Sequence, residues 1–123
     1  MTQRADHPAE RGRARRRTVR EAACGRSVLV LGENEPQNVR QLDEPERGGR
    51  GLDALWNDDF HHSAMVAATG RSEAYYSDYR GSAQELVSAV RHGFLYQGQV
   101  SSWQDGRRGS PALGTRAMTF VAF

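Results

Sequence analysis

Two acidic residues stand directly after an apolar run of the sequence and are the first candidates for chemistry. Ser27–Gly32 contains four consecutive large apolar residues, and Glu33 and Glu35 follow it before Pro36. A carboxyl group at the dry end of a strand can have its pKa raised enough to act as an acid near neutral pH. We therefore predict Glu33 as the catalytic candidate, and the alternative is an ordinary acid on a surface loop. A Glu33–Glu35 pair ranks lower, because two side chains so close on one loop rarely flank a substrate bond.

A second polar cluster follows the next apolar run, Leu52–Trp56. Its members suit hydrogen bonding to a substrate, and they are Asn57, Asp58, Asp59, His61 and His62. The same residue types could bind a metal ion. However, adjacent histidines point to different sides of a strand or loop, and neither HxH nor HExxH spacing is present. We favour a hydrogen-bonded cluster that lines a pocket, and we predict neither a metal nor a cofactor.

Four aromatic residues could provide flat surfaces for sugar rings, and they are Tyr75, Tyr76, Tyr79 and Trp103. Aromatic side chains more often simply pack against other residues, and this alternative stays open for each of them. We include Tyr76 in the predicted substrate-binding set.

The elements that must position these residues predict an α/β fold with a parallel sheet. The four consecutive apolar residues in Ser27–Gly32 are typical of a strand buried on both faces, and two further short strands are predicted at Leu52–Trp56 and Ala117–Phe123. Parallel strands place their carboxyl ends on one side of a sheet, where barrel enzymes carry their functional groups. Glu33 and Asp58 should therefore emerge at the same edge.

Two helices are predicted between the second and third strands. Ser63–Thr69 is rich in small apolar residues, and Ser63 would cap its first turn. The second helix follows Ser82, which forms a capping box with Glu85, and carries apolar residues on one face. Residues 97–116 are polar and rich in glycine, and this composition predicts a long loop.

The charges divide the chain into two parts. Residues 1–26 carry eight arginines and three acidic residues, a net charge of +5, whereas residues 27–123 carry a net charge of −3. Residues 1–20 contain almost no large apolar side chain, so we predict a disordered Arg-rich leader over 1–20. Residues 21–123 form the predicted partial barrel domain. The leader could bind nucleic acid, but no aromatic residue interleaves its arginines, so we favour a solvated tail and do not expect a nucleic-acid partner.

Composition also excludes several classes of protein. All 17 basic residues are arginine, which removes Schiff-base lysines and a P-loop lysine. A single cysteine, Cys24, excludes an internal disulfide and favours a cytoplasmic location. No apolar stretch approaches the roughly 20 residues of a membrane span, so we expect no membrane partner.

Several stretches of the chain resemble the malto-oligosyltrehalose trehalohydrolases, glycosidases of the α-amylase family. The resemblance covers residues 25–123, and the sequence WNDDFHH with its neighbours is specific to this family rather than generic. The matching stretches are GENEPQNVR (Gly32–Arg40), GLDALWNDDFHHSA (Gly51–Ala64), EAYYSDYRGSAQELVSA (Glu73–Ala89), HGFLYQGQ (His92–Gln99) and RRGSP (Arg107–Pro111).

The resemblance implies part of a (β/α)8 TIM barrel with retaining chemistry that releases trehalose from maltooligosyltrehalose. It identifies Ser27–Gly32 as the fifth barrel strand, Leu52–Trp56 as the sixth and Ala117–Phe123 as the beginning of the seventh. Glu33 then corresponds to the general acid/base, and the loop over residues 57–62 borders the sugar subsites.

The resemblance also implies that two carboxyl groups of the family have no counterpart here. The nucleophilic aspartate follows the fourth strand, and a further aspartate would fall just beyond Phe123. A retaining glycosidase needs two carboxyl groups about 5–5.5 Å apart. We therefore expect an incomplete barrel that is inactive and poorly soluble alone. The expected partners are maltooligosyltrehalose or a related α-glucan and a complementary barrel chain. The alternative is a non-catalytic maltooligosaccharide-binding or interaction module.

Overall fold

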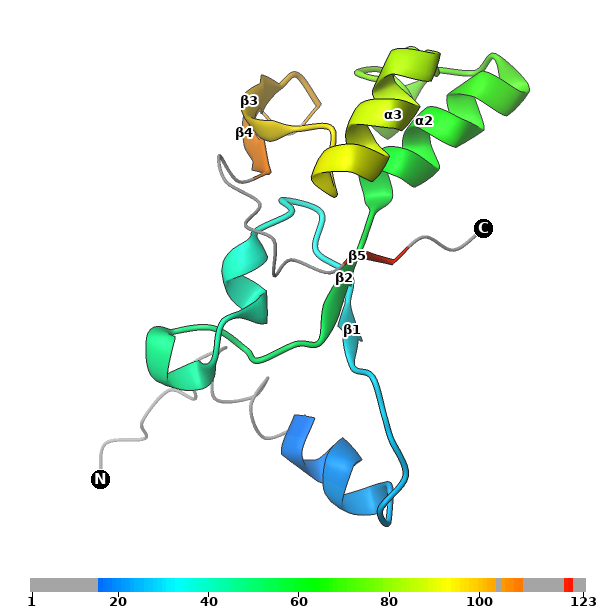
Figure 1. The fold of residues 1–123 in the computed structure, drawn as a ribbon. Coiled ribbons are helices and arrows are strands. Elements are labelled where there is room, and N and C mark those ends of the chain that lie inside the picture. The colour runs from blue at the N-terminus through cyan, green and yellow to red at the C-terminus, as the bar shows by residue number, and fades with distance from the viewer. Residues whose placement is uncertain (1–15, 104, 110–118, 121–123) are drawn as a thin grey trace.

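Three short parallel strands form a sheet in the middle of the molecule (Figure 1). The computed structural model describes residues 16–103, 105–109 and 119–120. Strand β1 spans Leu31–Gly32, β2 spans Ala54–Trp56 and β5 spans Thr119–Phe120, and their order in the sheet is β1-β2-β5. Both pairings are parallel, with Leu31 opposite Ala54. The predicted parallel arrangement is confirmed, although the strands are shorter than predicted and most of the third lies outside the described residues.

The first strand is less buried than its sequence predicts. Leu29 is 57% exposed, so the prediction of a strand covered on both faces is wrong for this residue. In place of a longer ladder, Asp53 holds the backbone at Val30: the Val30 N–H donates to Asp53 Oδ2 over 2.8 Å, and the Asp53 N–H donates to the Val30 carbonyl over 3.0 Å. Within the described residues, β1 has only β2 as a neighbour in the sheet.

Two α-helices lie beyond the carboxyl end of β2 and pack against each other (Figure 1). Helix α2 spans Asp58–Thr69 and helix α3 spans Ala83–His92. The predicted capping box of α3 is confirmed, because the Ser82 hydroxyl accepts the Glu85 N–H and the Glu85 carboxylate accepts the Ser82 N–H, each over 3.3 Å. The predicted start of the other helix at Ser63 is wrong, since α2 begins at Asp58.

The remaining helical segments are short. The connection between β1 and β2 contains the 3-10 helices η1 (Val39–Leu42) and η2 (Pro45–Arg47), and η3 (Ala74–Tyr76) follows α2. Residues 16–22 are helical and lie at the end of the molecule opposite α2 and α3 (Figure 1). Residues 16–20 were predicted to belong to the disordered leader, and residues 1–15 lie outside the described part of the chain.

A β-hairpin occupies part of the segment that was predicted to be a long loop. Strand β3 spans Gln97–Ser101 and pairs antiparallel with β4, which spans Gly106–Gly109. The hairpin is tied to the loop after β1, because the Gly109 N–H donates to the Pro36 carbonyl over 2.9 Å. Only glycine fits at position 109, where φ is +76° and a Cβ atom would lie 1.7 Å from the Tyr96 carbonyl oxygen.

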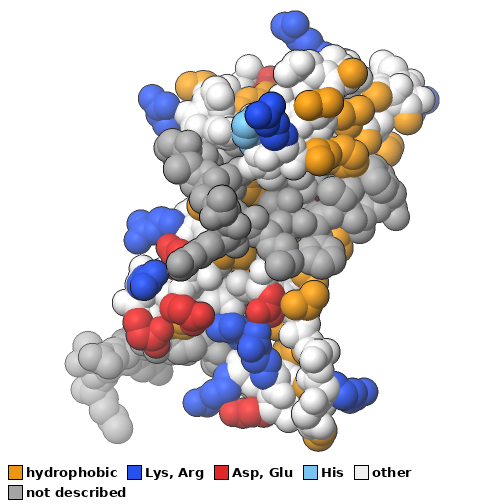
Figure 2. Space-filling model, viewed as in Figure 1, with side chains coloured by type: hydrophobic (Ala, Val, Ile, Leu, Met, Phe, Trp, Pro, Cys, Tyr) orange, Lys and Arg blue, Asp and Glu red, His pale blue; other side chains and the backbone are white. Residues whose placement is uncertain are grey.

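The apolar core of the described residues is small. Its members are Ala23, Ala54, Leu55, Val66, Tyr79, Ala89 and Phe94, of which three are alanine. Apolar side chains also gather on the surface over the two helices (Figure 2), and Val87 and Val90 of α3 are 57% and 66% exposed. A small core of this kind gives marginal stability, because little apolar area leaves water on folding.

Candidate active site at the carboxyl ends of β1 and β2

A cavity of about 480 Å³ opens at the carboxyl ends of β1 and β2. Glu33 follows β1 directly and Asp58 follows β2 after one residue, and the parallel pairing brings both to the same edge. The prediction that these two carboxyl groups share one edge is confirmed. The cavity is lined by Glu33, Glu35, Asp58, His61, His62, Tyr75, Tyr76 and Trp103.

Burial and neighbouring charges perturb the pKa of one acid of this cavity, Asp58. Burial raises the pKa of Asp58; the Arg108 charge opposes this effect, and the negative charges on Glu33 and Asp59 add to it. The negative charge on Glu33 therefore acts on Asp58 across the cavity. Two acids in one partly desolvated cavity are the chemistry that general acid/base catalysis requires.

Asn57 explains why the polar cluster after β2 is helical and not a loop. Its Oδ1 accepts the Phe60 N–H over 3.1 Å and caps α2, while its Nδ2 donates to the Ala89 carbonyl of α3 over 3.1 Å. Asp58 and Asp59 then occupy the first turn, where negative charge stabilises the helix dipole. Asn57 is 3% exposed and does not line the cavity. An asparagine followed by two aspartates is a helix-start signal that the sequence contains.

The helical geometry separates the two adjacent aspartates. Successive residues of an α-helix are rotated by about 100°, so Asp58 faces the cavity while Asp59 faces the interior. The Asp59 side chain is 0% exposed and accepts four hydrogen bonds. The donors are the Tyr79 hydroxyl at 2.6 Å, the Leu95 N–H at 2.7 Å, the Tyr96 N–H at 2.9 Å and Arg108 Nε at 3.1 Å. Asp59 therefore joins α2 to the hairpin from behind the cavity wall.

His62 stands between the cavity and this buried network. Its ring contacts three tyrosines, with centroid distances of 5.4 Å to Tyr75, 5.1 Å to Tyr76 and 5.0 Å to Tyr79. Burial, reinforced by the positive charge on Arg108, lowers the pKa of His62 to about 4. The imidazole is therefore neutral at pH 7 and can accept a hydrogen bond from a ligand hydroxyl.

The β3–β4 hairpin brings Trp103 and Arg108 to this site, and their positions could not be predicted from the sequence. Trp103 lies in the hairpin turn and lines the cavity, and Asp78 holds this turn by accepting the Ser101 hydroxyl over 2.9 Å and the Trp103 N–H over 3.1 Å. Arg108 of β4 is 3% exposed and pairs with Asp59. The Asp105-Gly106 dipeptide is a turn signal, but no apolar alternation flanks it, so it does not by itself predict a hairpin.

The described residues offer no group of three or more histidine, cysteine, aspartate or glutamate side chains that could hold a metal ion. Within the same ranges, none of the helices has the length and apolar character needed to cross a bilayer. The side chains that line the cavity carry carboxyl, imidazole and aromatic groups.

Comparison with curated proteins finds relatives of a single name. The chain is 36% identical over 94 residues to malto-oligosyltrehalose trehalohydrolase of Mycobacterium tuberculosis, covering 76% of this chain and 16% of the relative. It is 42% identical over 72 residues to the protein of that name from Deinococcus radiodurans, covering 57% of this chain and 12% of the relative. The protein of that name from Saccharolobus solfataricus is 30% identical over 95 residues, which are 77% of this chain and 17% of the relative.

The chain is similar in sequence to the malto-oligosyltrehalose trehalohydrolases. A crystal structure of a proposed α-amylase from Salmonella typhimurium supports the relationship, with a TM-score of 0.65 and 28% identity over 87% of this chain and 19% of that protein. The chain therefore has the local fold of a segment of an α-amylase-like protein. It spans about a sixth of the length of the trehalohydrolases that it matches. No protein-family model matches it.

Proposed function

We propose that this chain provides the general acid/base of a retaining glycosidase that acts on maltooligosyltrehalose and releases trehalose, in the cytoplasm, as a step of trehalose biosynthesis. One observation carries the proposal: Glu33 and Asp58 follow neighbouring parallel strands and line one cavity together with aromatic side chains. The relationship to the trehalohydrolases supports the substrate and the bond cleaved.

Glu33 is proposed to work in two steps. Its protonated carboxyl donates a proton to the glycosidic oxygen as the carbon–oxygen bond breaks, which leaves a carboxylate. That carboxylate then accepts a proton from the water molecule that releases the sugar from its covalent intermediate. The position of Glu33 at the carboxyl end of a parallel strand suits this role, because barrel enzymes carry their catalytic groups there.

The nucleophile is proposed to come from another part of the barrel. Asp58 and Glu35 line the same cavity, but neither follows a fourth barrel strand, where the family resemblance places the nucleophilic aspartate. We therefore propose that the isolated chain has no turnover and that the complete site includes a complementary barrel segment, either in the same polypeptide or as a second chain.

The sugar is proposed to contact the side chains of the cavity wall. Asp58, His61, His62 and Tyr76 belong to the predicted substrate-binding set and line the cavity, and Trp103 adds a further aromatic surface. Asn57 and Asp59, which belong to the same set, are buried behind the wall and would act by holding α2 and the hairpin in place.

The experiment is complementation. The chain is mixed with the remaining barrel segment of a curated trehalohydrolase, and trehalose release from maltooligosyltrehalose is measured. Trehalose should appear with the mixture, and Glu33→Gln should reduce the rate by several orders of magnitude. Glu46→Gln is the matched control, because Glu46 is an exposed acid of η2 outside the cavity. A Glu33→Gln mixture with the wild-type rate would refute the role, and turnover by the isolated chain would refute the need for a partner.

A second candidate function is a non-catalytic module that binds maltooligosaccharides. The exposed rings favour it, because Tyr75 and Trp103 at the cavity are 45% and 52% exposed and offer flat surfaces to a sugar. Calorimetric titration with maltooligosaccharides separates the two functions. Saturable binding that is lost in Trp103→Ala, without turnover in any complemented mixture, would favour the module.

A further inference from the structure

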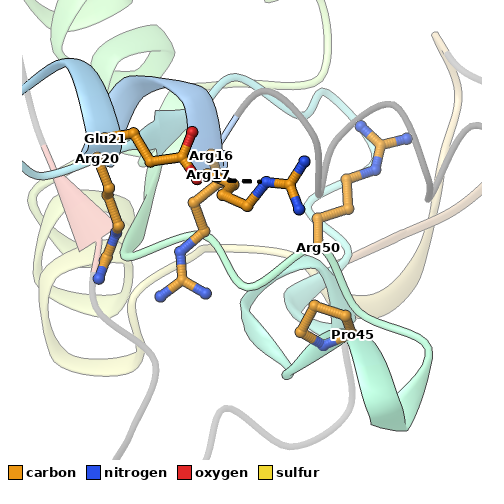
Figure 3. A pocket seen from close by; sticks show the side chains of 6 residues that line it. All are labelled: Arg16, Arg17, Arg20, Glu21, Pro45 and Arg50. Carbon is orange, nitrogen blue, oxygen red and sulfur yellow. Dashed lines mark ion pairs between the residues drawn. The ribbon is translucent and has the colours of Figure 1, made fainter.

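A second cavity, of about 450 Å³, lies at the opposite end of the sheet and is lined mainly by arginine. We name it the arginine cavity, and its wall consists of Arg16, Arg17, Arg20, Glu21, Pro45 and Arg50 (Figure 3). Three of its arginines come from the helical residues 16–22 and the fourth from the turn before β2. It is therefore separate from the cavity that contains Glu33.

Two of the four arginines have acidic partners that fix the helix to the sheet. Arg20 Nη2 lies 2.5 Å from Asp53 Oδ1, and Arg16 lies 3.8 Å from the same oxygen and 3.6 Å from Glu44 Oε2. Burial alone would raise the pKa of Asp53, but the hydrogen bond from the Val30 N–H and the Arg20 guanidinium lower it below its usual value. Asp53 thus stays ionised and balances one positive charge of the cavity wall.

The other guanidinium groups of the wall are poorly compensated. Arg17 pairs only with Glu21 within the described residues, at 3.5 Å, and both side chains are more than two-thirds exposed, where an ion pair contributes little. Arg50 makes no ion pair with any described residue. Arg16 Nε is buried and has no hydrogen-bond acceptor among the described residues. Among the described residues, the charge of Arg50 is therefore unpaired and that of Arg17 is only weakly paired.

We propose that the arginine cavity binds the phosphoryl group of a small molecule. A guanidinium presents its N–H donors in a planar fork that matches phosphate oxygens, and a phosphate dianion accepts from several such groups at once. Arg17 and Arg50 would be its principal donors, because both line the cavity and neither has a buried acidic partner among the described residues. The cavity volume leaves room for an organic part beside the phosphate, so the ligand class is a phosphate ester or inorganic phosphate.

The test is calorimetric titration of the full chain with inorganic phosphate and, separately, with a hexose phosphate at constant ionic strength. Saturable binding of either probe is expected, and a tighter Kd for the hexose phosphate would identify the ester as the better ligand. Arg50→Ala and Arg17→Gln should each weaken binding about tenfold or more, because each removes a charge-assisted hydrogen bond. Arg71→Ala is the matched control, since Arg71 is exposed, lies outside this cavity and carries the same charge.

Several outcomes would overturn the proposal. They are the absence of binding by the folded wild-type chain, equal binding of the unphosphorylated hexose, and equal weakening by Arg71→Ala. The Arg17 side chain is 77% exposed, so Arg17→Gln should leave the fold intact, and a circular dichroism spectrum checks this. None of these readouts depends on Glu33 or on trehalose release, so the proposed enzymatic function can fail while this site stands.

Discussion

The strongest prediction concerns the buried carboxylate of Asp59 and compares it with its neighbour. Asp59→Asn keeps the size of the side chain but leaves one acceptor oxygen in place of two. If that oxygen keeps the N–H groups of Leu95 and Tyr96, the new amide N–H₂ faces Arg108 Nε, and two donors meet. The Tyr79 hydroxyl can rotate to accept, but a guanidinium cannot.

The expected cost follows from the burial of this pair. The side chains of Asp59 and Arg108 are 0% and 4% exposed, and Arg108 Nη2 already has no hydrogen-bond partner among the described residues. Leaving a buried charge without its partner destabilises a protein by about 3–5 kcal/mol. Because a whole domain is stable by only about 5–15 kcal/mol, Asp59→Asn should remove a large part of the free energy of unfolding.

The assay is urea unfolding followed by the fluorescence of Trp56 and Trp103 and by circular dichroism. Asp58→Asn is the matched control: burial and the Glu33 charge disfavour its ionised form, so loss of that charge should change the free energy of unfolding by less than about 1 kcal/mol. The double variant Asp59→Asn/Arg108→Met should be more stable than Asp59→Asn alone, because the orphaned cation is gone. An Asp59→Asn variant as stable as the Asp58→Asn control would refute the reasoning.

Two further predictions concern His62 and Asp78. The folded pKa of His62 is lowered to about 4, so between pH 6.5 and pH 4 the unfolded chain binds a proton that the folded chain does not. The contribution of neutral His62 to the free energy of unfolding is therefore fully present above pH 6.5 and is lost on acidification. We expect a loss of about 1–2 kcal/mol after allowance for partial exposure. An NMR titration of the His62 ring with a midpoint near 6.5 would contradict this prediction. Asp78→Ala should release the hairpin turn, because the Ser101 hydroxyl and the Trp103 N–H lose their common acceptor. Hydrogen exchange at the Trp103 amide should accelerate about tenfold, and an unchanged rate would show that the turn holds itself.

The sequence predicted those parts of the fold that depend on neighbours along the chain. The predicted Ser82–Glu85 capping box is confirmed. It could be predicted because a capping box involves only four consecutive residues. The parallel pairing of β1 and β2 is also confirmed. It could be predicted because each of the two apolar runs is followed by polar residues, a pattern that favours a parallel sheet. The predicted helix start at Ser63 is five residues too late, because the helix-start signal formed by Asn57, Asp58 and Asp59 precedes it.

The hairpin shows where sequence reasoning failed for a physical reason. Strands β3 and β4 contain glycine, glutamine and arginine and have no apolar alternation. Their position depends on contacts with distant residues: Arg108 with Asp59, Ser101 with Asp78, and the Gly109 N–H with Pro36. Composition indicated a loop there, because none of these partners is near in sequence.

The sequence by itself determined the chemical groups of this protein and the edge of the sheet at which Glu33 and Asp58 emerge, since these follow from local pattern and from the geometry of parallel strands. Only the tertiary structure decided which of two adjacent aspartates faces the cavity and which is buried against an arginine 49 residues away. Asp58 and Asp59 are adjacent and chemically identical, so the local sequence does not distinguish them. Their different surroundings arise from the rotation between successive residues of the helix and from the partners that the fold brings to each side.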